Sequence, residues 1–409
     1  MLNRIEVFLI ILTLVLLPWS WSLSLYALAL LFLNMAAKCI TTRRVGNPVL
    51  DRFARMPFYA MIAFVAWYAV SLLWTENLSE GYEMAATKGS MALASIIFLC
   101  SDMRHITRRQ LRLMLYLASL SLVCLFLVRL GINIRRVITE PETTWVSRMT
   151  FGFDKRHHSY ISFYIIVALW GLCYEQIHSW HQMSSWCRCG IVALVVLLSA
   201  YLVVINSRAG VLFLLISLFL MAGYVIYLRR RWFKPVVSLL CALSVAVGVH
   251  YALPKTQNRV QQTSLTSAAA SQGTTEQASR KDKRLPIWQA SLRLASDNWL
   301  LGVGVGDRFD SLVPLFNELG DQESIDRRKN CHCQPLDTLV SVGIIGLIVL
   351  LSLFVSLIVA SVRQRNWLLF VFTLCLGFNC LFETLFDRQM ALFFVPIVVG
   401  LLSMKNSVK

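Results

Sequence analysis

Long apolar runs separated by short polar segments extend along almost the whole of this chain. A helical span through the hydrocarbon core of a bilayer needs about twenty apolar residues. Residues 5–37 are too long for one span and slightly short for two, and Pro18–Trp21 predicts a break between two short helices. The other apolar runs predict ten more spans: 58–74, 85–100, 111–130, 159–174, 190–206, 209–228, 235–253, 335–362, 367–382 and 389–403.

This pattern predicts an all-α polytopic membrane protein with about twelve transmembrane helices, and the composition agrees with it. Of the 409 residues, 57% are hydrophobic and only 15% are charged, whereas soluble domains carry about a quarter charged residues. The net charge of +17 could suggest nucleic acid as a partner. Most basic residues, however, lie in short loops between apolar runs, where membrane lipids and topology explain them better. No basic groove with interleaved aromatic residues is visible, so nucleic-acid binding is not expected.

Basic residues also predict the orientation. Those on one side of a twelve-span arrangement are found in 38–55, 101–112, 229–234, Arg188, Arg363, Arg365 and Lys405. By the positive-inside rule this side is cytoplasmic, and both termini lie inside. The N-terminal run lacks a small-residue cleavage pattern, which indicates an uncleaved span. The predicted domains are spans one to nine in 1–253, a large extracytoplasmic loop in 254–334, and spans ten to twelve in 335–409.

The polar residues suited to chemistry therefore share the extracytoplasmic side. They occur in 131–158, 206–208, 254–334 and 383–388. Within the large loop, Leu285, Trp288, Leu292 and Ala295 recur at helical spacing. With Trp299, they predict a short helix that lies at the membrane interface.

Two arginines are candidate ligands for a phosphate group. Arg208 follows an apolar span directly, and a charge at such a depth usually faces a cavity and pairs with another group. The alternative is an arginine that extends from a helix end to the interface. Arg284 begins the expected interfacial helix, and its alternative is a solvated basic cluster. Two guanidinium groups in one aqueous vestibule would suit a diphosphate, because each binds phosphate oxygens bidentately.

His332 precedes the long span 335–362 and is a candidate general base, because an imidazole near neutral pH accepts protons from hydroxyl groups. The alternative is a structural or solvated histidine. Cys331 and Cys333 flank it, but a zinc site needs further ligands, and none is nearby in the sequence. We therefore expect no metal, and whether the two cysteines form a disulfide stays open.

The segment GVGVGD contains Gly302, Gly304 and Gly306. Its third glycine is misplaced for a dinucleotide fingerprint, so a tight turn that allows close backbone approach is the better interpretation. The other polar candidates are His158 at the end of 131–158, Gln334, and the pair Glu383 and Arg388, which could form a plain ion pair.

Three motifs, in this order, resemble the O-antigen ligase family of bacterial membrane glycosyltransferases. NSRAGVL has the family's Arg-x-x-x-Leu at the start of a span, and RLPIWQASLRLASDNWLLGVGVGD has its periplasmic arginine before an aromatic residue. HCQPLDTLVSVGIIG has its histidine at the head of a helix that runs to Gly-hydrophobic-hydrophobic-Gly. The family shares a superfamily with O-antigen polymerases and O-linked protein oligosaccharyltransferases.

The resemblance implies a glycosyltransferase-C type fold in the bacterial inner membrane, with no cofactor and an active site that faces the periplasm. The implied donor is a glycan on undecaprenyl diphosphate, the acceptor is the lipid A core, and the anomeric configuration is inverted. Arg208 and Arg284 would stabilise the departing diphosphate, and His332 would accept the acceptor's proton. The expected substrate-binding residues are Arg208, Arg284, Gly304, Gln334, His158, Glu383 and Arg388.

Two kinds of alternative remain open. Within the superfamily, the chain could be a polymerase or a ligase whose acceptor is a protein, because no feature of the sequence reads the acceptor. In a different class, it could be a transporter of lipid-linked glycans without catalysis. Transporters often show internal repeats or charges along the interior of their spans, and neither is evident here.

Overall fold

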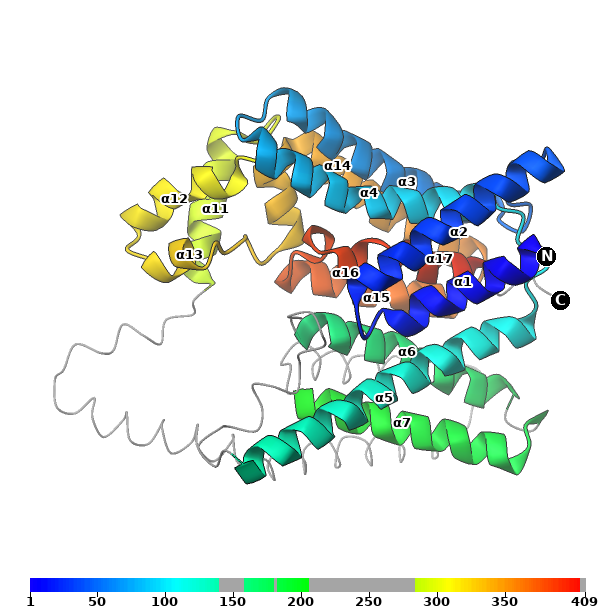
Figure 1. Cartoon of the computed structure of the whole chain (residues 1–409). Coiled ribbons are helices and arrows are strands. Elements are labelled where there is room, and N and C mark those ends of the chain that lie inside the picture. Colours follow the sequence, from blue (N-terminus) through cyan, green and yellow to red (C-terminus); the bar gives the residue numbers. More distant parts are fainter. Residues whose placement is uncertain (140–157, 180–181, 206–283, 405–409) are drawn as a thin grey trace. The chain divides into compact units, whose positions relative to one another are not determined.

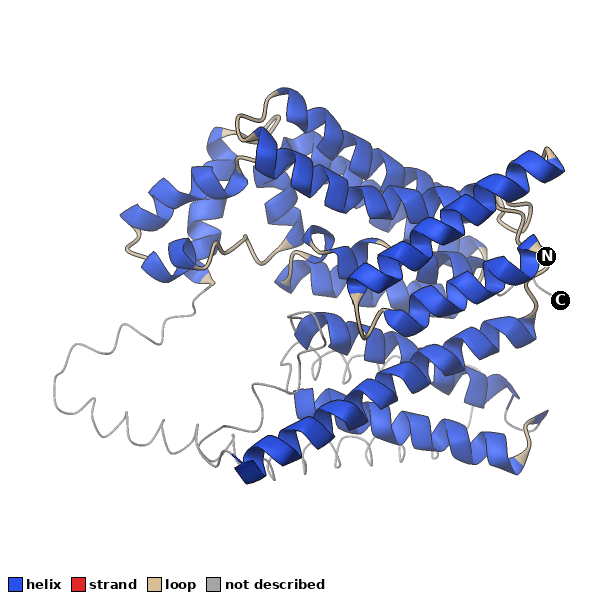
Figure 2. Cartoon of the chain, viewed as in Figure 1, coloured by secondary structure: helices blue, strands red, loops and turns tan. Residues whose placement is uncertain are grey.

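The computed structural model describes residues 1–139, 158–179, 182–205 and 284–404. Helices dominate this part of the chain, which contains no strand, and the all-α prediction is confirmed for it (Figure 2). The chain divides into two units, Met1–Leu117 with Lys283–Lys409 (unit 1) and Ala118–Asp282 (unit 2). Both are helical (Figure 1).

Unit 1 begins with a helical hairpin, α1 (Leu2–Leu16) and α2 (Trp21–Thr42). The break predicted at Pro18–Trp21 is present, since α1 ends before it and Ser20 caps α2 by accepting a hydrogen bond from the Leu23 backbone N–H. The two helices lie side by side in Figure 1, and the Ser24 hydroxyl donates to the Thr13 carbonyl at 3.1 Å.

The centre of unit 1 is formed by α3 (Arg52–Val70), α4 (Leu78–Cys100) and α14 (Gln334–Arg363), with α3 packed against both of the others. Asp51 and Asn77 cap the N-termini of α3 and α4. The one-turn helix η1 (Ser71–Leu73) follows α3. The last elements are α15 (Trp367–Phe382), η4 (Leu385–Asp387), α16 (Gln389–Leu392) and α17 (Phe394–Met404).

A break interrupts α14 at Val342 and Gly343, whose backbone angles are not helical. The turn that follows α11 satisfies the freed backbone groups: Val303 and Gly304 donate to the carbonyls of Val340 and Ser341, and Ile344 donates to the Trp299 carbonyl. The Trp67 indole donates to the Val342 carbonyl at 2.9 Å. Irregular backbone within a long apolar helix is tolerated where protein groups replace the lost hydrogen bonds in this way.

Three short helices, α11 (Leu285–Asp297), α12 (Arg308–Glu318) and α13 (Gln322–Asp326), gather at one end of unit 1 (Figure 1). We call this the cap end. These helices share a small apolar core with the start of α14, and it includes Ile287, Leu294, Phe316, Cys331 and Val340.

The helix predicted near residue 285 is present as α11, and it carries two apolar stripes. Leu285 and Leu292 are exposed, whereas Ile287, Ala290 and Leu294 are buried beside Ala295. The sequence carries two apolar stripes here, and packing against α12 and α14 selects the second. The interfacial position of α11 stays a prediction, which now rests on the exposed stripe.

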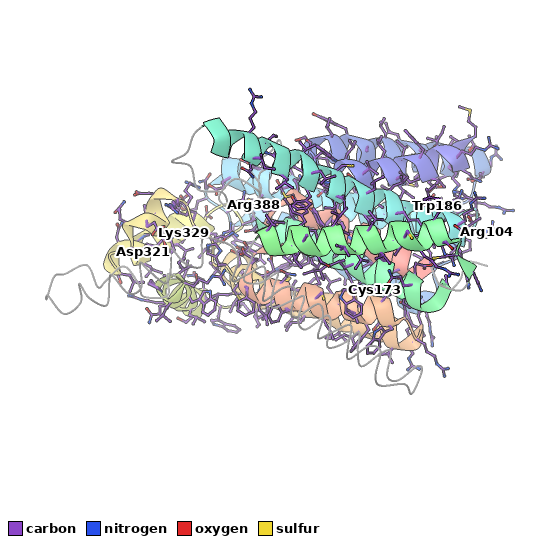
Figure 3. The ribbon with its side chains drawn as sticks, turned by 90° about the horizontal axis from the view of Figure 1, so that it is seen from below. Arg104, Cys173, Trp186, Asp321, Lys329 and Arg388 are labelled. Carbon is purple, nitrogen blue, oxygen red and sulfur yellow. The ribbon has the colours of Figure 1, made fainter. Side chains whose placement is uncertain are left out.

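The opposite end of unit 1 carries the short basic loops, and we call it the basic end. Arg104 there and Asp321 and Lys329 at the cap end mark the two extremes in Figure 3. Hydrogen bonds join the loops at the basic end, for example from the backbone N–H of Gly46 to the carbonyl of Cys100. The arginines at this end that flank the described helices include Arg43, Arg44, Arg52, Arg55, Arg104, Arg108, Arg109, Arg363 and Arg365.

Unit 2 contains most of α5 (Arg108–Thr139), together with α6 (His158–Ser179) and α7 (Ser185–Ile205). The rings of Phe126 and Tyr201 stack within this unit, with centroids 4.7 Å apart. Over both units, the described residues include six helices that are long and apolar enough to cross a membrane. The predicted spans 209–228 and 235–253 lie outside the described residues, so the count of twelve stays a prediction.

Candidate functional site

Three of the predicted site residues converge at the cap end of unit 1. Glu383 lies between Arg284 and His332: its Oε1 is 3.6 Å from Arg284 Nη2, and its Oε2 is 3.6 Å from His332 Nδ1. About a third of the Arg284 side chain and a quarter of the His332 side chain are exposed, whereas Glu383 is nearly covered. The arrangement combines a guanidinium, a carboxylate and an imidazole on a surface that substrates can reach.

His332 is held by the loop that joins α13 to α14. Its backbone has a positive φ of 48°, and its N–H donates to the Asn330 side chain at 3.3 Å. The neighbouring Cys331 is buried in the cap-end core, and its carbonyl accepts a hydrogen bond from the Trp288 indole at 3.1 Å. His332 Nδ1 is buried without a hydrogen-bond partner among the described residues, and the carboxylate of Glu383 is within 4 Å of it. This geometry leaves Nε2 as the nitrogen that can act on a substrate.

Cys331 and Cys333 are both free thiols in the structure, so no disulfide joins them. Burial raises the pKa of Cys331 well above its ordinary value, and it also raises that of Cys333. Both thiols are therefore protonated at neutral pH and are poor nucleophiles or metal ligands.

Glu383 caps the C-terminus of α15 and begins the turn 383–388. The plain ion pair between Glu383 and Arg388 does not form, because the carboxylate faces Arg284 and His332 instead. Arg388 lies at the other end of the turn, where it is exposed. Thr384, next to Glu383, accepts a hydrogen bond from the Asn330 amide, so the turn and the histidine loop are tied together.

Gln334 and Gly304 have packing roles rather than a place on the open face. Gln334 is fully buried, its amide donates to Thr338 at 3.2 Å, and its Oε1 accepts from the backbone N–H of Phe386 at 2.7 Å. At Gly304 the φ is +106°, and a Cβ would lie 2.6 Å from the Thr75 hydroxyl. The GVGVGD segment is thus a tight turn with close backbone approach, as its sequence predicted.

Two other predicted residues belong to unit 2. Arg208 lies outside the described residues. His158 is the first residue of α6, and only its backbone is described. Their roles stay predictions.

A buried group of four charges at the cap end was missed by the sequence analysis. Lys88 of α4 pairs with Asp387 at 3.0 Å, and Arg308 of α12 pairs with Asp387 at 2.6 Å and with Asp337 of α14. We call these four residues the cap-end network. The apolar run 85–100 contained the one sequence signal, because a lysine inside a span usually pairs with an acid or lines a functional cavity.

Two members of the cap-end network, Asp387 and Arg308, keep their charges in spite of burial. Burial alone would raise the pKa of Asp387, but the charges of Arg308 and Lys88 and their hydrogen bonds lower it below its ordinary value. Burial alone would lower the pKa of Arg308, but Asp337 and Asp387 raise it well above its ordinary value. Asp387 is therefore ionised and Arg308 is protonated at neutral pH.

Together, the long apolar helices and the polar cluster at one end define a multi-pass, all-α membrane protein with a candidate site outside its apolar spans. Comparison with known families finds that residues 193–351 match the family model described as O-antigen ligase. The matched range contains all three motifs, so the resemblance seen in them is confirmed. Comparison with curated proteins finds no match.

Proposed function

We propose that the chain is an O-antigen ligase that transfers a glycan from undecaprenyl diphosphate to a sugar hydroxyl of the lipid A core. The observation that carries this proposal is the convergence of Arg284, His332 and Glu383 at the cap end. The first two head separate family motifs that are 48 positions apart in the sequence (284 to 332). Within an O-antigen ligase domain, a base and a cation beside one open surface are the groups that glycosyl transfer from a diphosphate needs.

The proposed reaction is a direct displacement at the anomeric carbon. The acceptor hydroxyl oxygen forms the new glycosidic bond while the bond from the anomeric carbon to the diphosphate oxygen breaks, and the configuration inverts. His332 Nε2 accepts the hydroxyl proton, and the Glu383 carboxylate beside Nδ1 orients the ring and stabilises the imidazolium. The bonding electrons leave with the lipid diphosphate.

The departing diphosphate needs positive charge, which Arg284 supplies and Arg208 is expected to add. Over a third of the Arg284 side chain is exposed, and its guanidinium is 3.6 Å from Glu383. Its fork of N–H donors is therefore accessible to a phosphate beside His332. The arginines supply the charge that a metal would otherwise provide, so we propose a metal-independent mechanism.

We also propose that the protein lies in the bacterial inner membrane with its cap end in the periplasm. The arginines at the basic end support this orientation, because short loops rich in arginine remain in the cytoplasm. The lipid A core and the lipid-linked glycan would then both approach the cap end from the outer leaflet.

The test is a purified protein in detergent or liposomes with an undecaprenyl-diphosphate glycan as donor. A ligase forms a product on lipid A core and none on a second donor molecule. A longer lipid-linked glycan would instead identify a polymerase, and a labelled protein acceptor would identify a protein oligosaccharyltransferase. Flux of the donor across the bilayer without any product would identify a transporter. In cells, deletion should remove the long-chain lipopolysaccharide ladder while the lipid-linked glycan accumulates.

A further inference from the structure

The turn 383–388 is held from several directions at once. Lys88 Nζ donates to the Phe386 carbonyl at 2.7 Å and to Asp387 Oδ1 at 3.0 Å. Arg308 Nη1 donates to Asp387 Oδ2 at 2.6 Å, and Gln334 accepts from the Phe386 N–H. Both backbone groups of Phe386 and both carboxylate oxygens of Asp387 therefore have partners, which come from three helices: Lys88 on α4, Arg308 on α12 and Gln334 on α14.

Four buried charges beside one short turn contribute little net free energy to the stability of the fold. Lys88 and Asp337 are fully buried, and Asp387 and the Arg308 side chain are nearly so. Desolvation of such groups costs about as much as their attraction returns, and apolar residues of similar size often stabilise a protein equally well. What charged partners add is a defined geometry, because each hydrogen bond fixes a direction.

Glu383 is the residue of the candidate site that this fixed geometry can position. Glu383 lies at the start of the same turn, four residues before Asp387, and its two carboxylate oxygens face Arg284 and His332 at 3.6 Å each. Glu383 caps α15 through its backbone N–H, which donates to the Asn379 carbonyl, so it lies where the helix passes into the turn. The contacts that hold the turn therefore also act on the position of Glu383.

We propose that Lys88 and Arg308 are positioning residues for glycosyl transfer: through Asp387 they hold the turn 383–388 so that Glu383 stays between His332 and Arg284. The proposal rests on the proposed function. A displacement of Glu383 by about 1 Å would leave His332 without its orienting partner, and errors of this size can cost about a hundredfold in rate.

The test removes charges in pairs, so that no lone buried charge remains. In Lys88→Met/Asp387→Asn, Arg308 and Asp337 still form a neutral pair. The matched control is Glu6→Gln/Lys38→Met, which removes another buried lysine–carboxylate pair, 2.6 Å long, at the basic end of the same unit. Glu383→Gln is the reference for a lost carboxylate. For all variants, the thermal midpoint in detergent, kcat and the KM for donor are measured.

We expect both double variants to fold with similar losses in thermal midpoint. The cap-end variant should lose about ten- to a hundredfold in kcat, with little change in KM for donor, whereas the control should keep the wild-type kcat. A role in folding alone predicts equal kcat for the two double variants once they are compared per folded molecule, and this result would overturn the proposal. A cap-end variant that fails to fold is replaced by Arg308→Gln/Asp337→Asn, which leaves Lys88 paired with Asp387.

A second readout does not depend on transfer. Diethyl pyrocarbonate modifies imidazole nitrogens that solvent can reach, and Nδ1 of His332 is buried 3.6 Å from the Glu383 carboxylate. If the turn 383–388 moves, His332 should be modified faster in the cap-end variant than in wild type or the control, as measured by peptide mass spectrometry. A wild-type rate in the cap-end variant would overturn the positioning role. Should the wild-type protein transfer no glycan, the proposed function fails, and this measurement still decides the positioning.

Discussion

Unit 1 buries charged residues at both of its ends, and the two groups differ in what they connect. At the basic end, Lys38 pairs with Glu6, whose carboxylate also accepts from Ser101 and lies 3.5 Å from His105. This basic-end cluster joins the hairpin α1–α2 to the loop between α4 and α5. The cap-end network instead joins α4, α12 and α14 to the turn that carries Glu383.

Buried charges have two different roles in this molecule. The Glu6 carboxylate of the basic-end cluster contacts Lys38, Ser101 and His105. Burial together with the charge of Lys38 lowers the pKa of His105, so this imidazole is neutral at neutral pH. The cluster closes a helix junction and reaches none of the predicted site residues. The cap-end network instead binds the turn that begins with Glu383, and Gln334 bonds to the same turn at Phe386. The buried charges at the basic end thus connect helices and a loop, whereas those at the cap end hold the turn that carries a residue of the candidate site.

Substitution of His332 should reduce the rate of glycosyl transfer more than any other change. A general base predicts that His332→Ala and His332→Gln both lose between about a hundred- and ten-thousandfold in kcat, because neither replacement accepts a proton at neutral pH. Donor binding should be unchanged. The measurement is transfer from a lipid-linked donor in vitro, beside Cys331→Ser/Cys333→Ser as a control for the loop. Activity of His332→Gln within a few-fold of wild type would show that hydrogen bonding suffices and that His332 is no base.

Arg284 should give the next largest effect. Arg284→Ala should abolish measurable transfer while the protein still inserts, and we expect the same of Arg208→Ala. Removal of one group that stabilises developing charge typically costs about a hundred- to a thousandfold. Lysine should rescue either position poorly, because it lacks the bidentate fork. Full activity in both Arg284→Lys and Arg208→Lys would mean that simple positive charge is enough.

Single substitutions of the two buried lysines compare the ends directly. Lys88→Met leaves two carboxylates to share Arg308, and Lys38→Met leaves Glu6 without its cation. Breaking a buried pair from one side costs about 3–5 kcal/mol, so thermal denaturation in detergent should show a similar loss for both variants. Only Lys88→Met should also lower transfer per folded molecule. Equal transfer rates in the two variants would erase the distinction between the ends.

Much of this architecture could be predicted from the sequence, because the lengths of the apolar runs and the residues that interrupt them are local signals. The break at Pro18–Trp21 and the helix near residue 285 are both present. The buried face of α11 could not be predicted reliably, since two apolar stripes compete and only packing against α12 and α14 decides between them. Gln334 was assigned to substrate for a similar reason: its neighbours in the sequence do not reveal that the Phe386 backbone, 52 positions away, takes up its amide oxygen.

The site shows the same division between local and distant signals. Arg284 and His332 head recognisable motifs, so their importance could be predicted, and Glu383 was named on position alone. An ion pair of Glu383 with Arg388 was an open alternative from sequence proximity, whereas the fold brings Arg284 and His332 close to the Glu383 carboxylate. Asp337 and Arg308 gave no signal of their own. From the sequence alone, Asp337 is an acidic residue in the first turn of a helix, where it interacts favourably with the helix dipole. Only the fold reveals its partner Arg308 on α12.

The smallest effect on activity is expected from the variants that test which end faces the periplasm. Gln322→Cys at the cap end and Arg104→Cys at the basic end both replace exposed side chains outside the candidate site. In a background without native cysteines, neither should change transfer. In intact cells with a permeable outer membrane, an impermeant maleimide should label Gln322→Cys but not Arg104→Cys, because the arginine-rich loops hold the basic end inside. Lysed cells, in which both positions react, provide the control. Labelling of Arg104→Cys alone would place Arg284, His332 and Glu383 in the cytoplasm, away from the lipid A core and the flipped donor, and would end the ligase proposal while leaving the contrast between the two charge groups intact.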